Sequence, residues 1–216
     1  RYSVQDEAAL GEVMDVFASG ISTLTNPRKI ASTMNSVHGT TTCDTTVDKY
    51  IGYAEEAFIL TRVKRYNVKG RKYIGTPYKI SFEDIGLRNA RLAFRQIEGT
   101  HIMENIIYNE LRFRGYQVDV GTVESRERDA GGKEVRIQRE IDFIATLGSK
   151  KYYIQSAYAI PDKEKYEQET MSFERTTDSF KKIIIVEKSM KPRYDENGYL
   201  MMGVKEFLLD ANSLLV

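Results

Sequence analysis

Two neighbouring segments, residues 139–144 and 152–157, carry polar side chains inside patterns typical of buried strands. Successive side chains of a strand point to opposite faces, so Glu140 and Asp142 share one face of the first segment. Gln155 lies within the second segment. A carboxylate removed from water is costly unless a partner offsets the loss of hydration. We therefore expect a cation or a hydrogen-bond network to meet Asp142.

A second carboxylate, Glu104, lies in a segment predicted to be helical from Thr100 to Arg114. The apolar stripe of this helix consists of Met103, Ile106, Ile107 and Leu111. Glu104 is three and seven positions from the last two of these residues, which places it at the edge of the stripe. We expect this carboxylate to point toward a sheet.

A basic hairpin is the third feature whose side chains could take part in binding or catalysis. Two strands are expected at residues 58–66 and 72–82, joined by a segment of turn composition. The cations that could bind nucleic-acid phosphates here are Arg62, Lys64, Arg65, Lys69, Arg71 and Lys72. Exposed hairpins are also lysine-rich simply to stay soluble. In addition, the preceding helix carries four acidic residues that would repel DNA, Asp44, Asp48, Glu55 and Glu56.

The elements before and within this hairpin suggest a first domain over residues 1–85. Apolar periodicity predicts three helices, one ending at Gly20, one from 27 to 36 and one ending near Phe58. Three helices followed by a hairpin is the order of a winged helix. In that fold the third helix can enter a major groove while the hairpin lies on phosphates.

The remaining elements suggest an α/β domain over residues 86–216. After the helix that bears Glu104, strands are predicted at 116–123, 135–147 and 152–159, followed by a helix from Pro161 to about Phe180. The β-branched run at 183–186 favours a strand buried on both faces. A helix between two such strands implies a parallel crossover within a mixed sheet. A short strand and a closing helix are expected between residues 198 and 209.

Composition narrows the class of protein. In 216 residues, 41% of them hydrophobic, no apolar run approaches the length of a membrane span, and no Gly-Lys-Ser/Thr phosphate loop occurs. We expect a soluble cytoplasmic protein, and we expect that these 216 residues do not themselves bind ATP. Because the chain begins at Arg1 without methionine, we expect it to be part of a longer polypeptide. The single cysteine, Cys43, is predicted to be a buried helical thiol.

The order of these elements and acidic residues resembles the PD-(D/E)xK restriction-endonuclease-like superfamily. More closely, it resembles the C-terminal region of bacterial and archaeal AAA-type ATPases, in which a winged helix precedes a nuclease-like domain of unknown function. The residues that carry the resemblance are Thr45 to Ile51, Asp84 to Ala90, Glu104 to Leu111, Glu140 to Ile144, and Tyr153 to Gln155.

The resemblance implies a two-domain α/β fold, a winged helix followed by an αβββαβ nuclease-like domain. In active members, an acid on the second strand and a Glu-x-Lys on the third hold a divalent metal and activate water. Asp142 matches the first acid and Glu104 the helical one, so these two residues are the candidate metal ligands. Gln155 and Ala157 stand where the glutamate and the lysine would be, which predicts a degenerate catalytic site. Bound Mg²⁺ is doubtful for such a site.

We therefore expect a non-catalytic nucleic-acid-binding or partner-binding module of an AAA-type ATPase. DNA and the N-terminal ATPase domain of the same polypeptide are the expected partners, and an oligomer is compatible with this role. ATP would bind only in that N-terminal domain. The alternatives are an active metal-dependent DNA nuclease that uses Glu104, Asp142 and Gln155, and a purely protein-binding regulatory module.

Overall fold

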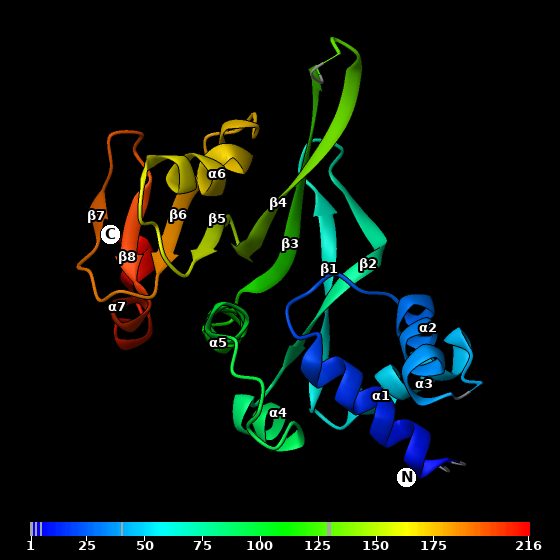
Figure 1. The fold of residues 1–216 in the computed structure, drawn as a ribbon. Coiled ribbons are helices and arrows are strands. Elements are labelled where there is room, and N and C mark those ends of the chain that lie inside the picture. Colours follow the sequence, from blue (N-terminus) through cyan, green and yellow to red (C-terminus); the bar gives the residue numbers. More distant parts are fainter. Residues whose placement is uncertain (1, 3, 5, 40, 129–130) are drawn as a thin grey trace. The chain divides into compact units, whose positions relative to one another are not determined.

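The computed structural model describes residues 2, 4, 6–39, 41–128 and 131–216 (Figure 1). It confirms an α/β protein with an eight-stranded mixed sheet. Contacts divide the chain into two compact units. Unit 1 comprises Arg1–Lys64 and Gly75–Asn105, and unit 2 comprises Arg65–Ile74 and Ile106–Val216. The domains predicted at residues 1–85 and 86–216 remain a prediction, because these units are defined by contacts alone.

Three helices open unit 1, as predicted: α1 (Glu7–Ser19), α2 (Pro27–His38) and α3 (Asp44–Glu56). The start of α2 follows from its sequence, because the Asn26 side chain accepts a hydrogen bond from the Lys29 N–H (2.9 Å) and Pro27 occupies the first turn. The helices bury one shared core, which includes Val13, Phe17, Ile30, Met34, Val47 and Ile51.

The hairpin and two further helices follow: β1 (Leu60–Asn67), β2 (Lys72–Phe82), α4 (Ile85–Arg91) and α5 (Gly99–Phe113). Ile80 and Phe82 of β2 complete the core of unit 1. The tip of the hairpin, from Arg65 to Ile74, belongs to unit 2 instead. Helix α5 ends two residues before Gly115, whose φ of +85° suits glycine because it has no Cβ.

Unit 2 contains the other strands and helices: β3 (Gln117–Arg128), β4 (Glu134–Leu147), β5 (Lys150–Ala157), α6 (Lys163–Glu174), β6 (Lys181–Val186), β7 (Arg193–Tyr194), β8 (Leu200–Gly203), α7 (Val204–Leu209) and a 3₁₀ turn (Ser213–Leu215). The helix predicted to reach Phe180 is wrong at its end, since α6 stops at Glu174. There the Arg175 N–H reaches back to the Ser172 carbonyl (3.3 Å) in a tightened last turn.

The sheet order is β2-β1-β3-β4-β5-β6-β8-β7. Strands β3, β4 and β5 are joined antiparallel, whereas β5 and β6, and then β6 and β8, are parallel. The predicted parallel crossover through α6 is therefore confirmed. Within unit 2, Arg65–Asn67 of β1 also run parallel to Val120–Thr122 of β3.

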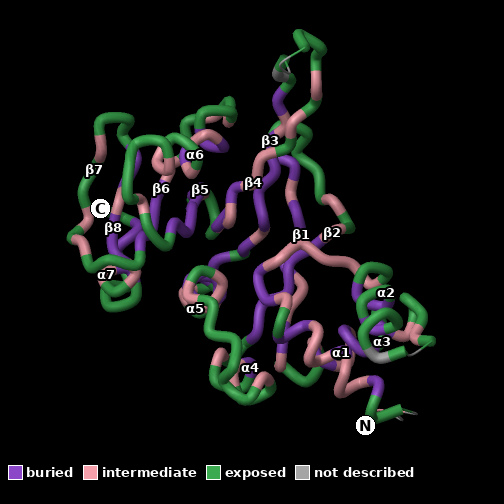
Figure 2. Tube along the Cα trace, viewed as in Figure 1, coloured by how far each residue is buried: buried purple, intermediate pink, exposed green. Residues whose placement is uncertain are grey.

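The core of unit 2 lies along its central strands, where Figure 2 shows buried residues in β5, β6 and β8. Helix α6 packs on β4 and β5, and α7 packs on β6 and β8. Ile183, Ile184 and Ile185 are fully buried, as expected for a strand covered on both faces. In the described part of the chain, no helix combines the length and the apolarity needed to cross a bilayer.

Candidate functional site

Asp142 and Gln155 meet where strands β4 and β5 separate. The last backbone pair of this antiparallel ladder is Phe143 with Ile154. Beyond it, the Asp142 carboxylate accepts a hydrogen bond from the Ser156 N–H (2.8 Å), and the Gln155 amide oxygen accepts one from the Asp142 N–H (3.4 Å). The expected hydrogen-bond network around Asp142 is confirmed. Each side chain serves a backbone donor of the opposite strand, in place of the missing ladder bonds.

The network continues from Gln155 to helix α6. The Gln155 amide nitrogen donates to Glu169 Oε2 (3.4 Å), and Lys165 Nζ forms an ion pair with Glu169 Oε1 (2.6 Å). Gln155 is only 9% exposed. An amide suits this position because it can accept from a backbone N–H on one side and donate to a carboxylate on the other. A glutamate could do both only if it were protonated.

These contacts do not fit a divalent metal. A hard cation needs several converging oxygen ligands, whereas the Gln155 side chain turns a donor toward Glu169, and that carboxylate is already paired with an ammonium. In residues 6–39, 41–128 and 131–216, no group of three or more His, Cys, Asp or Glu side chains could hold a metal ion. Ala157 is buried in the apolar core of unit 2. We assign no metal-dependent step to Asp142 or Gln155.

Glu104, the third predicted site residue, belongs to unit 1. Its carboxylate forms a 2.6 Å ion pair with Lys79 of β2, and the two side chains are 11% and 7% exposed. The expectation that Glu104 points toward a strand is confirmed. Its neighbour Asn105 also binds β2, because its side-chain oxygen accepts from the Phe82 N–H (2.7 Å) and its amide donates to the Phe82 carbonyl (2.8 Å). These contacts attach the start of α5 to the hairpin.

Two of the six predicted phosphate-binding cations already bind polar side chains of their own unit. Arg62 forms ion pairs with Glu55 (2.6 Å) and Asp48 (2.8 Å) of α3. The hydrogen bond to Glu55 raises the pKa of the Arg62 guanidinium. Arg65 is 5% exposed and donates to the Gln138 side chain (2.6 Å). Two of the acidic side chains on α3 therefore bind an arginine of the hairpin.

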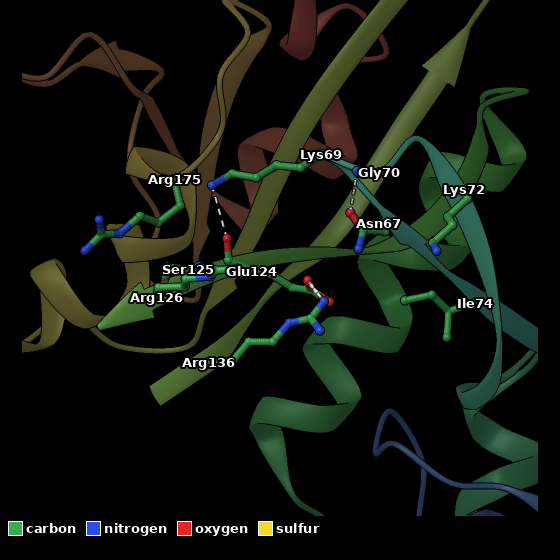
Figure 3. Close-up of a pocket in the computed structure, with 10 residues that line it drawn as sticks. All are labelled: Asn67, Lys69, Gly70, Lys72, Ile74, Glu124, Ser125, Arg126, Arg136 and Arg175. Atoms are coloured by element: carbon green, nitrogen blue, oxygen red, sulfur yellow. Dashed lines mark hydrogen bonds and ion pairs between the residues drawn. The ribbon is translucent and has the colours of Figure 1, made fainter. Parts of the chain in front are cut away.

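The other four predicted cations, Lys64, Lys69, Arg71 and Lys72, are exposed. Lys69 and Lys72 line a pocket of about 720 Å³ in unit 2, together with Asn67, Gly70, Ile74, Glu124, Ser125, Arg126, Arg136 and Arg175 (Figure 3). The pocket joins the β1–β2 turn to the outer parts of β3 and β4 and to the end of α6. We call it the basic pocket.

The charge of the basic pocket is strongly one-sided. Two lysines and three arginines line it, and Glu124 is the one carboxylate among its lining residues. Arg126 and Arg136 are direct partners across the β3–β4 ladder, an arrangement in which like charges repel. Glu124 pairs with Arg136, and the Lys69 ammonium donates to the Glu124 carbonyl (3.1 Å), as Figure 3 shows. Arg126 forms a long, exposed ion pair with Glu134 (3.7 Å), and an anion between Arg126 and Arg136 would further reduce their repulsion.

The turn that carries Lys69 is held in place by Asn67. This side chain is buried, and its oxygen accepts a hydrogen bond from the Gly70 N–H (2.6 Å). Asn67 also closes the parallel pairing of β1 with β3, opposite Thr122. The cations of the turn are therefore attached to a rigid strand end, which lowers the entropic cost of binding a ligand.

Sequence reasoning missed the three arginines of this pocket, because they are far from the hairpin along the chain. The signal that could have found two of them is the register of a long hairpin, since Arg126 and Arg136 are nearly equidistant from its turn. Nothing in the sequence indicates the third, Arg175, which comes from the end of α6.

The prediction of a buried Cys43 is wrong. Cys43 is exposed and occupies the N-cap position of α3, before the apolar face of that helix begins. Hydrogen bonds with the Thr45 and Thr46 hydroxyls (both 3.1 Å) lower the pKa of the thiol to about 7. This environment favours the thiolate.

Comparisons with known proteins give relatives without a described activity. Residues 2–98 match a family model described as a domain of unknown function, DUF8612. An uncharacterized protein of Haemophilus influenzae is 33% identical over 209 residues, which is 97% of this chain and 48% of that protein. The chain thus spans about half the length of this curated relative. The chain is also similar to protein VC1899 from Vibrio cholerae, whose crystal structure aligns with 97% of this chain and 56% of the VC1899 chain. The identity is 15% and the TM-score is 0.34.

Proposed function

We propose that this chain is a nucleic-acid-binding module that uses the basic pocket to hold phosphates. The observation that carries the proposal is the gathering of Lys69, Lys72, Arg126, Arg136 and Arg175 around a pocket with one acidic side chain. Arginine forks and lysine ammonium groups are the side chains that bind phosphodiester oxygens. The lining offers no aromatic ring to read bases, so we expect binding with little sequence preference.

We further propose that the module is the C-terminal part of an AAA-type ATPase, with a winged helix in the first half and a catalytically degenerate nuclease-like domain in the second. The order of elements supports the assignment, since three helices and a hairpin precede an αβββαβ succession. The match to about half of a longer relative is consistent with a missing portion. In this proposal ATP binds only in that portion, and the degenerate site holds no essential Mg²⁺.

Binding can be tested by fluorescence anisotropy with labelled duplex and single-stranded DNA over a range of salt concentrations. We expect affinity to fall steeply with salt, because bound phosphates release counterions. The Lys72→Ala/Arg126→Ala variant should bind more weakly and with a slope smaller by about two, since each lost phosphate contact removes about one unit. Both side chains are exposed, so this variant should remain folded.

The matched control is Lys191→Ala/Lys205→Ala, which removes the same charge from exposed positions outside the basic pocket. If both double variants lose affinity equally, binding follows overall charge and the pocket is not the site. If the intact chain binds neither DNA at low salt, the proposal fails and a protein-binding regulatory role takes its place.

The alternative, an active nuclease, would cleave plasmid DNA in the presence of Mg²⁺ or Mn²⁺. We expect the DNA to remain intact instead, because the Gln155 oxygen binds the Asp142 N–H and the Glu169 carboxylate binds Lys165. Cleavage that disappears in an Asp142→Ala variant would contradict the degenerate site. It would leave the binding role of the basic pocket untouched.

A further inference from the structure

A second pocket of unit 2, of about 810 Å³, lies where the parallel strands β5 and β6 end. Its walls are the segment from Tyr158 to Pro161 after β5, the end of β6 at Val186 with the following segment to Met190, and single residues of α6, β7 and β8. The carboxyl ends of parallel strands are the usual place for ligands in α/β sheets, and the volume suits a small organic molecule. We call it the strand-end pocket. It shares no lining residue with the basic pocket.

Aromatic and apolar side chains dominate the lining. Tyr158 is 43% exposed, which leaves part of its ring open to a ligand. Ile160, Met190 and Met201 pack against the core of unit 2 and also line the pocket. Flat aromatic rings and polarisable thioethers are good surfaces for an aromatic ligand.

One wall of this pocket is fixed by a hydrogen-bond network. The Met190 N–H donates to Glu206 Oε2 (3.1 Å), and the Ser189 hydroxyl donates to the other oxygen of the same carboxylate. The Gly203 N–H donates to the Met190 carbonyl (2.9 Å). Gly203 permits this close approach, because a Cβ there would lie 2.6 Å from the Met190 nitrogen. The loop after β6 is therefore held before any ligand arrives.

Tyr166 of α6 also lines the pocket and is likewise fixed. Its hydroxyl donates to Asp195 Oδ2 (2.5 Å) and accepts from the Asn197 amide (3.0 Å). Asp195 is in turn bound by the N–H groups of Asn197 and Tyr199. Burial raises the pKa of Tyr166 to about 12, so the ring is neutral at physiological pH. A fixed ring loses little entropy when a ligand packs on it.

Two cationic residues line this pocket, Lys188 after β6 and Arg193 of β7. Both side chains are exposed, and neither forms an ion pair or a hydrogen bond within the described ranges. Glu187 is the one carboxylate in the lining. Arg193 also lines a smaller adjoining pocket, where Lys163 is the other cation and Asp195 and Glu196 are the carboxylates.

We propose that the strand-end pocket binds a mononucleotide. The base would pack among Tyr158, Tyr166 and the two methionines, and the phosphate would be held by Arg193 and Lys188. A ligand that joins an aromatic ring to an anion matches both halves of the lining. An arginine fork can bind two phosphate oxygens at once.

The test is isothermal titration of the complete chain with AMP, and with adenosine and inorganic phosphate as its two halves. We expect AMP to bind more tightly than either half. Arg193→Ala and Tyr158→Ala should each weaken AMP binding by roughly tenfold, the effect of about 1.4 kcal/mol. Circular dichroism and the unfolding temperature should stay unchanged, because both side chains are exposed.

Two controls separate this site from nonspecific attraction. Lys191→Ala removes a nearby exposed charge that does not line the pocket, and Lys72→Ala weakens the basic pocket instead. AMP affinity should be retained in both. The proposal is overturned if AMP does not bind at millimolar concentration, if Arg193→Ala leaves its affinity unchanged, or if Lys72→Ala removes it. The first two results leave DNA binding by the basic pocket untouched, whereas the third would place the phosphate of AMP in the basic pocket.

Discussion

The contact between Gln155 and Glu169 predicts the effect of placing an acid at position 155. Gln155→Glu changes one amide group to a carboxyl group of nearly the same shape. The amide nitrogen now donates to Glu169 Oε2 at 3.4 Å, within a site that is 9% exposed at Gln155. After the substitution, two carboxylates would face each other across this distance. We therefore expect the substitution to destabilise the fold at neutral pH.

The loss of stability can be bounded for two forms of the new carboxyl group, the ionised form and the protonated form. Two unit charges 3.4 Å apart repel by about 5 kcal/mol at an effective dielectric constant of about 20. The new carboxyl group can avoid this repulsion by staying protonated and donating its O–H to Glu169. Raising its pKa from about 4.3 to 7 costs about 3.7 kcal/mol, the smaller of the two penalties. The ammonium of Lys165, bound to Glu169, reduces it further. We expect a loss of about 3 kcal/mol at pH 7.

The pH dependence distinguishes this mechanism from a packing defect. The folded-state pKa of the new group is raised above its unfolded value, so the folded state binds the additional proton. The penalty is therefore present at pH 7 and fades as the pH falls toward the unfolded pKa, about 4.3. Urea denaturation of wild type and variant between pH 4 and 8 measures it. Gln96→Glu, an exposed position, is the matched control. A loss that does not change with pH, or no loss at all, would refute the reasoning.

Three further results are expected. Iodoacetamide should alkylate Cys43 with a midpoint near pH 7 by mass spectrometry, and a midpoint near 8.5 would contradict the hydrogen-bonded thiol. Lys79→Ala should lower the free energy of unfolding by about 3–5 kcal/mol in urea, because it leaves the buried Glu104 carboxylate without its ammonium. The Lys79→Met/Glu104→Leu variant should recover most of that loss. Tyr153→Phe should cost about 1–3 kcal/mol in the same assay, since it leaves Asp178 Oδ2 without its 2.7 Å donor.

Local patterns predicted the elements of the fold well, because caps, periodicity and β-branched runs act over a few residues. The helix expected from residue 27 begins at Pro27, and the run at 183–186 lies in a strand covered on both faces. The end of α6 was missed, since no glycine or proline marks Glu174 as its last residue. Cys43 was misplaced because its burial depended on the position of a helix end, which shifts by one or two residues without a strong sequence signal.

The candidate sites were predicted only in part, because they depend on partners distant in sequence. Asp142 was expected to find a hydrogen-bond network, and the structure supplies the Ser156 N–H. The role of Glu169 could not be foreseen, since it requires the packing of α6 on β5. Likewise, Arg62 looked available for phosphates until the folded chain placed two carboxylates of α3 beside it.

The division of the chain into two units limits how the protein can be dissected. The backbone passes from one unit to the other at residues 64/65, 74/75 and 105/106, so no single cut separates them. A fragment that starts at residue 86 would lack Arg65–Asn67, the parallel partner of Val120–Thr122. Its β3 would then offer unpaired backbone groups along a newly exposed edge, which promotes association between copies. Truncation at this point would therefore yield an aggregating polypeptide, and studies of either half are better made by substitution within the whole chain.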